Sequence, residues 1–305
     1  MLALEADGLQ KRYGEVVAVR DVSFSVEQGE TFGILGPNGA GKTTTLEMIE
    51  GLTQPDAGNA RIMGEPVWPS PTKVQHRIGV QLQTTALFEA LTATELLDLF
   101  AGFYGVPTKG RAERLLRLVG LSEKCEAQAR QLSGGQQQRL AIALALVHDA
   151  EVVFLDEPTT GLDPQARRNL WDVIRGIAED GRTVILTTHY LDEAESLCDR
   201  VAIMDGGTII ALDSPTGLIA TLSDRARVTY DGSGLAEADL ATLDGVSHVA
   251  QDDGRVELTS AAPQQTLVEL IELARAHSVE LGNLAVRQPT LEDVFLDATG
   301  REFRS

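Results

Sequence analysis

Short apolar runs alternate with helical patterns from the N-terminus to about residue 215. Several runs are almost entirely apolar, which is typical of strands buried on both faces of a sheet. These runs predict strands at 31–35, 77–81, 152–155, 183–187 and 201–204. Apolar residues at helical spacing predict helices at 41–50, 96–105, 111–119, 136–148, 165–179 and 191–197. The alternation predicts a mixed α/β domain.

The pattern changes after a predicted turn at 213–215. Strands are expected at 227–230, 246–251, 255–259 and 280–286, and helices at 237–243, 264–277 and from Thr290 onward. The order βαββαβα is typical of a small two-layer α+β domain of the ferredoxin-like kind. We therefore expect two domains, residues 1–219 and 220–305.

Length and charge narrow the class of protein. The chain has 305 residues, enough for about two domains at roughly 150 residues each. A net charge of −19 disfavours broad binding to nucleic acid or to anionic lipid. Two distant cysteines predict neither a disulfide framework nor a zinc site, and no apolar run approaches the roughly 20 residues of a membrane span. The N-terminus does not resemble a signal peptide. We expect a cytosolic protein without a membrane span.

A glycine-rich motif lies between the strand expected at 31–35 and the helix that follows it. Residues 36–43 match G-x-x-x-x-G-K-[ST]. Glycines let backbone N–H groups curl around a phosphate, and the following helix directs its positive end at the same group. Lys42 would contact the β- and γ-phosphates, and Thr43 would offer its hydroxyl to Mg²⁺. The expected nucleotide-binding residues are Gly36, Pro37, Asn38, Gly39, Ala40, Gly41, Lys42, Thr43 and Thr44.

Two acids follow the apolar run at 152–155. Unpaired buried carboxylates are costly, so acids at the end of a buried strand require an explanation. We expect Asp156 to bind Mg²⁺ through water and Glu157 to polarise an attacking water as general base. The alternative is two solvated acids at a strand end.

The sequence Leu-Ser-Gly-Gly-Gln at 132–136 opens a predicted helix. Ser133 and Gln136 form a capping-box pattern, which accounts for these two residues structurally. It does not account for Gly134 and Gly135, because glycine in a helix costs roughly 1 kcal/mol relative to alanine. Bare N–H groups at this helix start could approach a phosphate closely.

This set of motifs, in this order, resembles the ATP-binding-cassette (ABC) ATPase family over residues 1 to about 215. The resemblance implies a P-loop NTPase fold with a mixed sheet and a helical subdomain, and ATP with Mg²⁺ as ligands. In that family two cassettes pack head to tail, with each ATP between one phosphate loop and the partner's LSGGQ. A single cassette therefore implies a homodimer or pairing with a related subunit.

The resemblance also assigns roles to single residues. Tyr13 would stack on adenine, Ser133, Gly134, Gly135 and Gln136 would contact the partner's ATP, and Asp163 would bridge the dimer interface. His189 would act as the switch histidine at the γ-phosphate. Gln83 would touch Mg²⁺ and the attacking water, although Gln81 lies two residues away and competes for this assignment. Structural alternatives are a packed tyrosine, a structural histidine and, for Asp163, a helix N-cap before Pro164, a role compatible with the interface.

The C-terminal segment at 288–296 is similar to the end of ATPase subunits of drug-resistance exporters, including those for daunorubicin-like antibiotics. The segment also predicts an amphipathic closing helix, with Thr290 as cap and Leu291, Val294 and Phe295 facing inward. The resemblance implies the energy-coupling subunit of an exporter, peripheral on the cytoplasmic face of the membrane and docked on a separate permease. The alternatives are a soluble ATP-dependent switch acting on a cytosolic partner, or a small-molecule kinase.

Overall fold

A computed structural model describes residues 1–82, 87–252 and 254–300. The chain divides into two compact units, the first covering Met1–Pro215 and the second beginning at Thr216. The expected boundary was between residues 219 and 220. It lies four residues later in the chain than the observed one, near the end of helix α7 (Pro215–Ala220).

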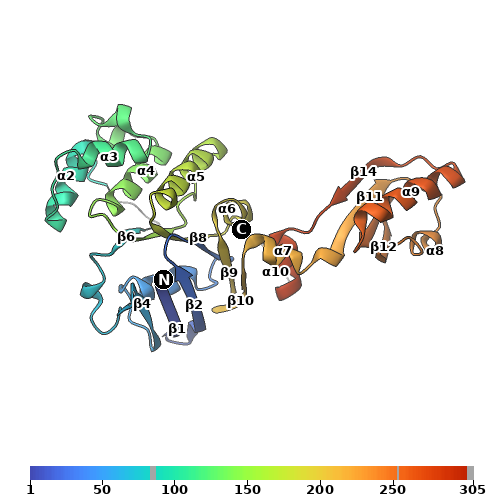
Figure 1. The fold of residues 1–305 in the computed structure, drawn as a ribbon, viewed down its shortest axis with the longest axis horizontal. Coiled ribbons are helices and arrows are strands. Elements are labelled where there is room, and N and C mark those ends of the chain that lie inside the picture. Colours follow the sequence, from blue (N-terminus) through green and yellow to red (C-terminus); the bar gives the residue numbers. More distant parts are fainter. Residues whose placement is uncertain (83–86, 253, 301–305) are drawn as a thin grey trace. The chain divides into compact units, whose positions relative to one another are not determined.

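The central sheet of the first unit has the strand order β10-β9-β3-β8-β7-β6 (Figure 1). β3, β6, β7, β8 and β9 run parallel, whereas β10 is antiparallel to β9. All residues of β3, β7 and β8 are buried, because both faces of the sheet are covered. Each apolar run therefore forms a strand as predicted. The bounds are β3 (Thr31–Leu35), β6 (Ile78–Gln81), β7 (Val152–Asp156), β8 (Thr183–Thr188), β9 (Arg200–Asp205) and β10 (Thr208–Asp213).

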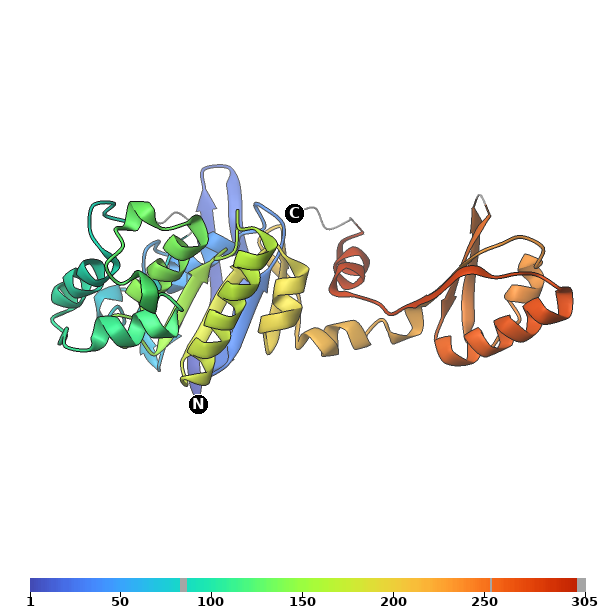
Figure 2. The same cartoon turned by 90° about the horizontal axis from the view of Figure 1, so that it is seen from above.

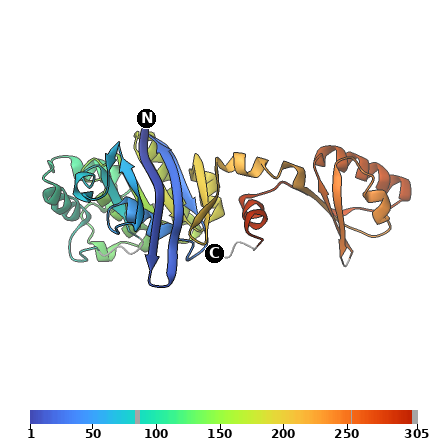
Figure 3. The same cartoon turned by 90° about the horizontal axis from the view of Figure 1, so that it is seen from below.

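A second, antiparallel sheet of the first unit has the order β2-β1-β4-β5 and was not predicted. Its long β1–β2 hairpin is the blue pair of strands in Figure 3. Register shifts interrupt the pairing of β1 with β2 at several points, so the two-residue alternation that marks a half-buried strand is lost. The bounds are β1 (Leu2–Tyr13), β2 (Val16–Glu27), β4 (Ala57–Ile62) and β5 (Glu65–Pro66).

The helices of the first unit include a group formed by α2, α3 and α4 (Figure 1), which corresponds to the expected helical subdomain. α4 begins two residues earlier than predicted, because Ser133 and Gln136 cap it reciprocally. Among the described residues, no helix is long and apolar enough to cross a membrane. The bounds are α1 (Lys42–Ile49), α2 (Ala93–Tyr104), α3 (Arg111–Leu118), α4 (Gly134–Ala145), α5 (Pro164–Glu179) and α6 (Leu191–Leu197).

The second unit has the predicted βαββαβα order and the strand order β12-β13-β11-β14, all pairs antiparallel. This is the split-βαβ arrangement of a ferredoxin-like domain. Helix α9 packs along the sheet (Figure 2) over a core that includes Val228, Tyr230, Leu258 and Leu270. The bounds are β11 (Ala226–Asp231), α8 (Glu237–Leu240), β12 (Val246–Asp252), β13 (Arg255–Ser260), α9 (Pro263–His277), β14 (Gly282–Arg287) and α10 (Leu291–Thr299).

Candidate nucleotide site

The glycine-rich loop connects β3 to α1, as predicted. Gly39 and Gly41 have φ angles of 80° and 102°, a region that favours glycine. A Cβ on Gly41 would lie 2.5 Å from the Ala18 carbonyl oxygen, and one on Gly36 would lie 2.4 Å from that of Met204. Gly41 is the N-cap of α1 and provides no side chain to its first N–H groups. The loop thus has the shape and the open donors that anion binding requires.

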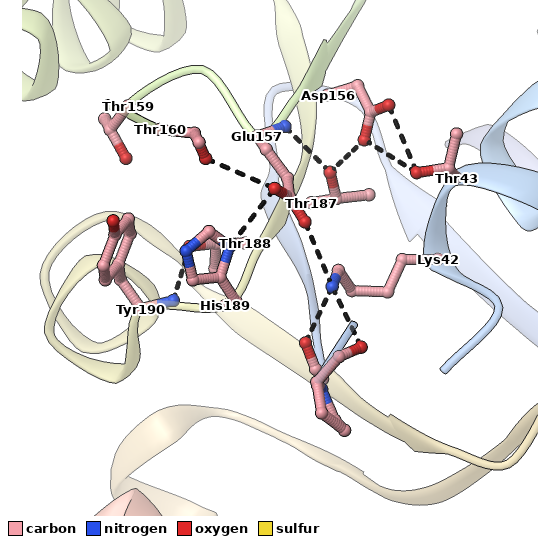
Figure 4. A network of polar contacts seen from close by, with 12 residues as sticks. Lys42, Thr43, Asp156, Glu157, Thr159, Thr160, Thr187, Thr188, His189 and Tyr190 are labelled. Carbon is pink, nitrogen blue, oxygen red and sulfur yellow. Dashed lines mark hydrogen bonds and ion pairs between the residues drawn. The ribbon is translucent and has the colours of Figure 1, made fainter. Parts of the chain in front are cut away.

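Lys42 directs its ammonium group back into this loop. Its Nζ donates to the carbonyl oxygens of Gly36 at 2.7 Å and Pro37 at 3.2 Å. The same Nζ lies 3.2 Å from Oε1 of Glu157, and both side chains are buried (Figure 4). The loop and the second predicted motif therefore meet through a buried ion pair. Ala40 is buried as well, whereas Asn38 is exposed and Thr44 is half-buried.

Asp156 ends β7 beside the first residues of α1. Oγ1 of Thr43 lies 3.3 and 3.4 Å from the two carboxylate oxygens of Asp156, and Thr187 donates to Oδ1 at 2.5 Å. Burial, together with the charge of Glu157, raises the pKa of Asp156 despite these hydrogen bonds. A nearby cation would reverse that shift. Because Mg²⁺ prefers oxygen ligands and is bound by one or two carboxylates plus substrate phosphates, Thr43 and Asp156 fit this ion.

Glu157 occupies the centre of the site (Figure 4). Its φ of 44° is unusual for a residue other than glycine, and its N–H donates to Oγ1 of Thr187 at 2.9 Å. Thr160 donates to Oε2 at 3.2 Å. Burial alone would raise the pKa of Glu157, but the charge and hydrogen bond of Lys42, with a further contribution from His189, lower it below its usual value. Glu157 is therefore ionised at neutral pH and able to accept a proton.

His189 follows β8 and joins the same cluster. Its Nδ1 lies 3.2 Å from Oε2 of Glu157, and its ring packs on Tyr190 with centroids 4.2 Å apart. Residues from three separated motifs thus converge at the ends of β3, β7 and β8. The carboxyl ends of adjacent parallel strands are the usual place for a ligand in an open α/β sheet.

A buried acid next to this cluster was missed in the sequence. Glu193 in α6 is fully buried, and it accepts hydrogen bonds from Thr159 Oγ1 and Trp171 Nε1, both at 3.1 Å. It ties the segment after Glu157 to the segment after His189. The available signal in the sequence is an acid in the first turn of the helix after His189, a position where the helix dipole alone also favours an acid.

Some predicted residues lie apart from this cluster. Within the part of the chain that the structure describes, no hydrogen bond or ion pair joins Lys42, Asp156 or Glu157 to the LSGGQ residues Ser133, Gly134, Gly135 and Gln136. Ser133 accepts from Gln136 N at 3.4 Å, and Gln136 Oε1 accepts from Ser133 N at 2.9 Å, so the predicted capping box is present.

Asp163 and Tyr13 lie at the ends of secondary-structure elements. Asp163 caps α5 through hydrogen bonds from Gln165 N and Ala166 N, both at 2.9 Å, as predicted. Tyr13 ends β1 and is 49% exposed, with Lys11 Nζ 5.5 Å from its ring centroid. It is therefore not a buried packing residue.

Of the two candidate loop glutamines, Gln81 belongs to the described residues. Gln83 lies outside the described residues. Gln81 is the last residue of β6, is 2% exposed, and donates from Nε2 to the Leu82 carbonyl oxygen at 2.5 Å. It does not belong to the cluster around Glu157.

Comparison with known proteins agrees with the geometry. Residues 19–160 match the family described as "ABC transporter", and residues 226–290 match "ABC transporter domain-containing protein-like, C-terminal domain". The linearmycin resistance ATP-binding protein LnrL of Bacillus subtilis is 38% identical, with 99% of each chain covered. The daunorubicin/doxorubicin resistance ATP-binding protein DrrA of Streptomyces peucetius is 38% identical over 98% of this chain and 92% of its own.

A solved structure supports the same conclusion. The ATP-binding cassette MJ0796, a dimer in a post-hydrolysis state bound to ADP and Pi, aligns with a TM-score of 0.62 at 28% identity. The alignment covers 69% of this chain and 98% of that structure. A buried phosphate-loop lysine, a strand-end carboxylate pair and a histidine therefore occur in a chain whose full-length relatives are ATP-binding proteins. The chain belongs to the ABC transporter family, as an ATP-hydrolysing subunit that couples energy to transport.

Proposed function

We propose that this chain powers an exporter, hydrolysing MgATP between two copies of itself and driving a separate transmembrane permease. The observation that carries the proposal is the ionised Glu157, held between Lys42 and His189 next to a phosphate-binding loop. Residues 1–219 would form the nucleotide-binding domain and residues 220–305 an accessory domain. The chain would lie on the cytoplasmic face of the membrane.

Each residue of the cluster has a distinct role in this proposal. Glu157 accepts the proton of the attacking water, and Lys42 exchanges its present contacts for phosphate oxygens. His189 donates a hydrogen bond to the γ-phosphate. Thr43 and Asp156, with Gln83, would hold Mg²⁺, which supplies positive charge beside the β- and γ-phosphates. Tyr13 would stack on adenine, for which its exposed ring is suited.

Two copies are proposed because the LSGGQ helix is separate from the rest of the site. The LSGGQ residues are Ser133, Gly134, Gly135 and Gln136 at the start of α4, and the side chains of Ser133 and Gln136 hydrogen-bond each other's backbone N–H groups. In a head-to-tail homodimer these residues would meet the partner's nucleotide, and Asp163 would lie at the interface. The dimeric form of the MJ0796 cassette supports this arrangement.

The class of substrate is proposed from relatives that match the chain along its whole length. These relatives are named as resistance ATP-binding proteins for linearmycin and for daunorubicin and doxorubicin. We infer export of an antibiotic-like or lipid-like compound. In this arrangement the permease, and not this chain, contacts the compound.

An apolar groove of about 390 Å³ provides a surface on which the permease can dock. α2 and α4 contribute residues to it, and so do β6 and the segment at 87–88. Leu52, Leu82, Phe88 and Tyr104 line it and are exposed. Exposed apolar side chains gathered in one groove are typical of an interaction site. Its lining residues Leu87, Phe88, Leu96, Phe100 and Tyr104 belong to the stretch 87–104, on which we propose that the permease docks.

Charge reversal beside this groove tests the docking surface. Glu89 precedes α2 and is exposed, so changing it to lysine is expected to uncouple transport while basal hydrolysis continues. Glu95 is a less selective site, because its carboxylate also accepts from Thr92 N at 2.8 Å and caps α2. Transport that is unaffected by both reversals would count against docking here.

Purification with the natural partner tests the function as a whole. The tagged Glu157→Gln variant would be purified from its native cells in mild detergent with ATP, and co-purifying proteins identified by mass spectrometry. A multi-span membrane protein in near-equal amount is expected. The matched control also carries Lys42→Ala, which removes the ammonium from the phosphate loop and should weaken the nucleotide-dependent association. A soluble partner with no membrane protein would contradict the exporter function and indicate a switch acting in the cytosol.

A further inference from the structure

A buried acid lines the groove, and no residue that the structure describes pairs with it as an opposite charge. Glu50 follows the last turn of α1 and is 3% exposed. Among the described residues, none forms a hydrogen bond or ion pair with its carboxyl group. Burial, with the charges of Asp156 and Glu47, raises its pKa to about 8. A carboxyl group in such a place is costly unless a donor or a cation compensates it.

An unsatisfied acceptor lies in the same groove. Gln81 is also almost fully buried, and its Oε1 has no hydrogen-bond partner among the described residues. Its Nε2 is already used by the Leu82 carbonyl oxygen. Buried polar atoms are normally hydrogen-bonded, so each exception requires an explanation. Here two acceptors, one directly after α1 and one at the end of β6, line one groove, and the described residues that line it include no lysine, arginine or histidine.

The remaining lining residues restrict what can compensate these acceptors. Most are apolar or aromatic, including Leu87, Leu96 and Phe100, and Glu50 is the one charged residue among those the structure assigns to the groove. A helix laid in such a groove binds through apolar residues spaced at one helical face. A single basic side chain from that helix would supply the donors that Glu50 and Gln81 lack.

We propose that the permease segment docking in this groove carries an arginine or lysine, flanked by apolar residues, that reaches Glu50 and Gln81. This inference rests on the proposed function and adds the chemistry of the partner. The apolar residues would supply contact area. The charge pair would fix the register of the segment and exclude segments that lack an arginine or lysine at this position.

Photo-crosslinking identifies the segment directly. Benzoylphenylalanine would replace Phe88 or Leu52, both exposed in the groove, in the full chain within its native cells. Mass spectrometry is expected to find a cytosolic segment of a multi-span membrane protein with an arginine or lysine within about one helical turn of the cross-link.

The other outcomes separate this inference from the proposed function. A permease segment without a nearby basic residue would overturn the inference and leave the exporter function standing. A soluble protein in the cross-link would overturn both. Cross-links to a second copy of this chain, or none from either position, would overturn the groove as the permease docking surface and with it the inference.

Substitution of Glu50 gives the second test, read as the ratio of permease to chain after purification in mild detergent. Glu50→Gln is expected to lower the ratio about tenfold, and Glu50→Arg further, because a buried pair loses one member or gains a like charge. Asp98→Asn and Asp98→Arg are the matched controls, since Asp98 is an exposed acid of α2 outside the groove lining. Equal ratios for the Glu50 and Asp98 variants would overturn the inference.

Two further measurements distinguish pairing from a general effect on folding. Glu50→Gln removes a buried acid, so the free chain is expected to keep or raise its Tm while it loses the permease. An acidic residue at the cross-linked basic position is expected to restore the ratio for Glu50→Arg. A fall in Tm that parallels the loss of permease, or failure of that acidic residue to restore it, would contradict the charge pair.

Discussion

The two units of the chain bury different kinds of side chain. Within the described residues of the first unit, the buried ionisable groups include Glu50, Lys42, Asp156, Glu157, His189 and Glu193. Within the second unit, the buried polar residues that the structure describes are Ser260 and Thr266. Oγ of Ser260 and Oγ1 of Thr266 lie 2.6 Å apart and share a hydrogen bond. Its ion pairs, such as Arg227 with Asp293, are at least partly exposed. The first unit holds charge in its interior, and the second holds neutral groups.

This difference indicates that the first unit is the part that performs the chemistry. Burying a charge destabilises a fold unless the charge is paired, so buried charges persist where a reaction requires them. The second unit resembles an ordinary small domain, with an apolar core covered by α9. We infer that hydrolysis depends on the first unit and that the second unit contributes no reacting group.

The largest expected effect is on turnover. Glu157→Gln keeps the shape of the side chain but removes its ability to accept a proton, so steady-state ATP hydrolysis is expected to fall by about 10²–10⁴-fold. The matched control is Glu257→Gln in β13 of the second unit, a partly exposed acid that should leave the rate unchanged. A normal rate in the Glu157 variant would refute the general-base role.

The next effect is expected in the second unit, on its stability and not on turnover. Leu258 is fully buried in the core of the second unit, and Leu258→Ala is expected to lower its free energy of unfolding by about 2–5 kcal/mol. The rate of ATP hydrolysis should stay within about twofold, since Leu258 belongs to the core of the second unit and the cluster around Glu157 is built from residues of the first. Val268→Ala, at an exposed position of α9, is the control for the unfolding measurement. Loss of hydrolysis with Leu258→Ala would show that the units are not functionally separate.

A smaller effect is expected from the acid beside the cluster. Glu193→Ala leaves the Thr159 hydroxyl and the Trp171 indole N–H without their acceptor and is expected to cost about 1–3 kcal/mol of unfolding free energy. Because Glu193 positions residues next to Glu157 and His189, kcat should fall while the KM for ATP changes little. Glu193→Gln, which keeps one acceptor oxygen, should recover part of the rate. A change confined to stability would reduce Glu193 to a packing role.

A further expected effect is a pH dependence of stability. Glu50 has a pKa of about 8 in the folded chain, against 4.5 as its ordinary value, so between these pH values the folded chain holds a proton that the unfolded chain has released. The stabilisation is complete below pH 4.5 and is lost as pH rises to about 8, at up to about 1.4 kcal/mol per pH unit. Glu50→Gln should therefore gain stability relative to wild type as pH rises, measured by denaturant unfolding. Asp98→Asn should not, and a constant difference would contradict the shift.

Sequence patterns predicted the parts of the fold that depend on local signals. The strands at the centre of the first sheet are continuous apolar runs, and the phosphate loop and the order of the second unit could be seen from spacing alone. The β1–β2 hairpin could not, because bulges interrupt its alternation. The contacts of Glu193 and Thr187 could not either, since their partners lie about 30 residues away and only folding brings them together.

The most direct test is the oligomeric state of Glu157→Gln, measured by sedimentation with and without MgATP. The account predicts a monomer without nucleotide and a dimer with two intact ATP molecules when MgATP is added, because each LSGGQ helix would close on the partner's nucleotide. Ser133→Arg, which would place a bulky charge at the start of α4, should block this dimer. A Glu157→Gln chain that binds ATP and remains a monomer would contradict hydrolysis between two copies.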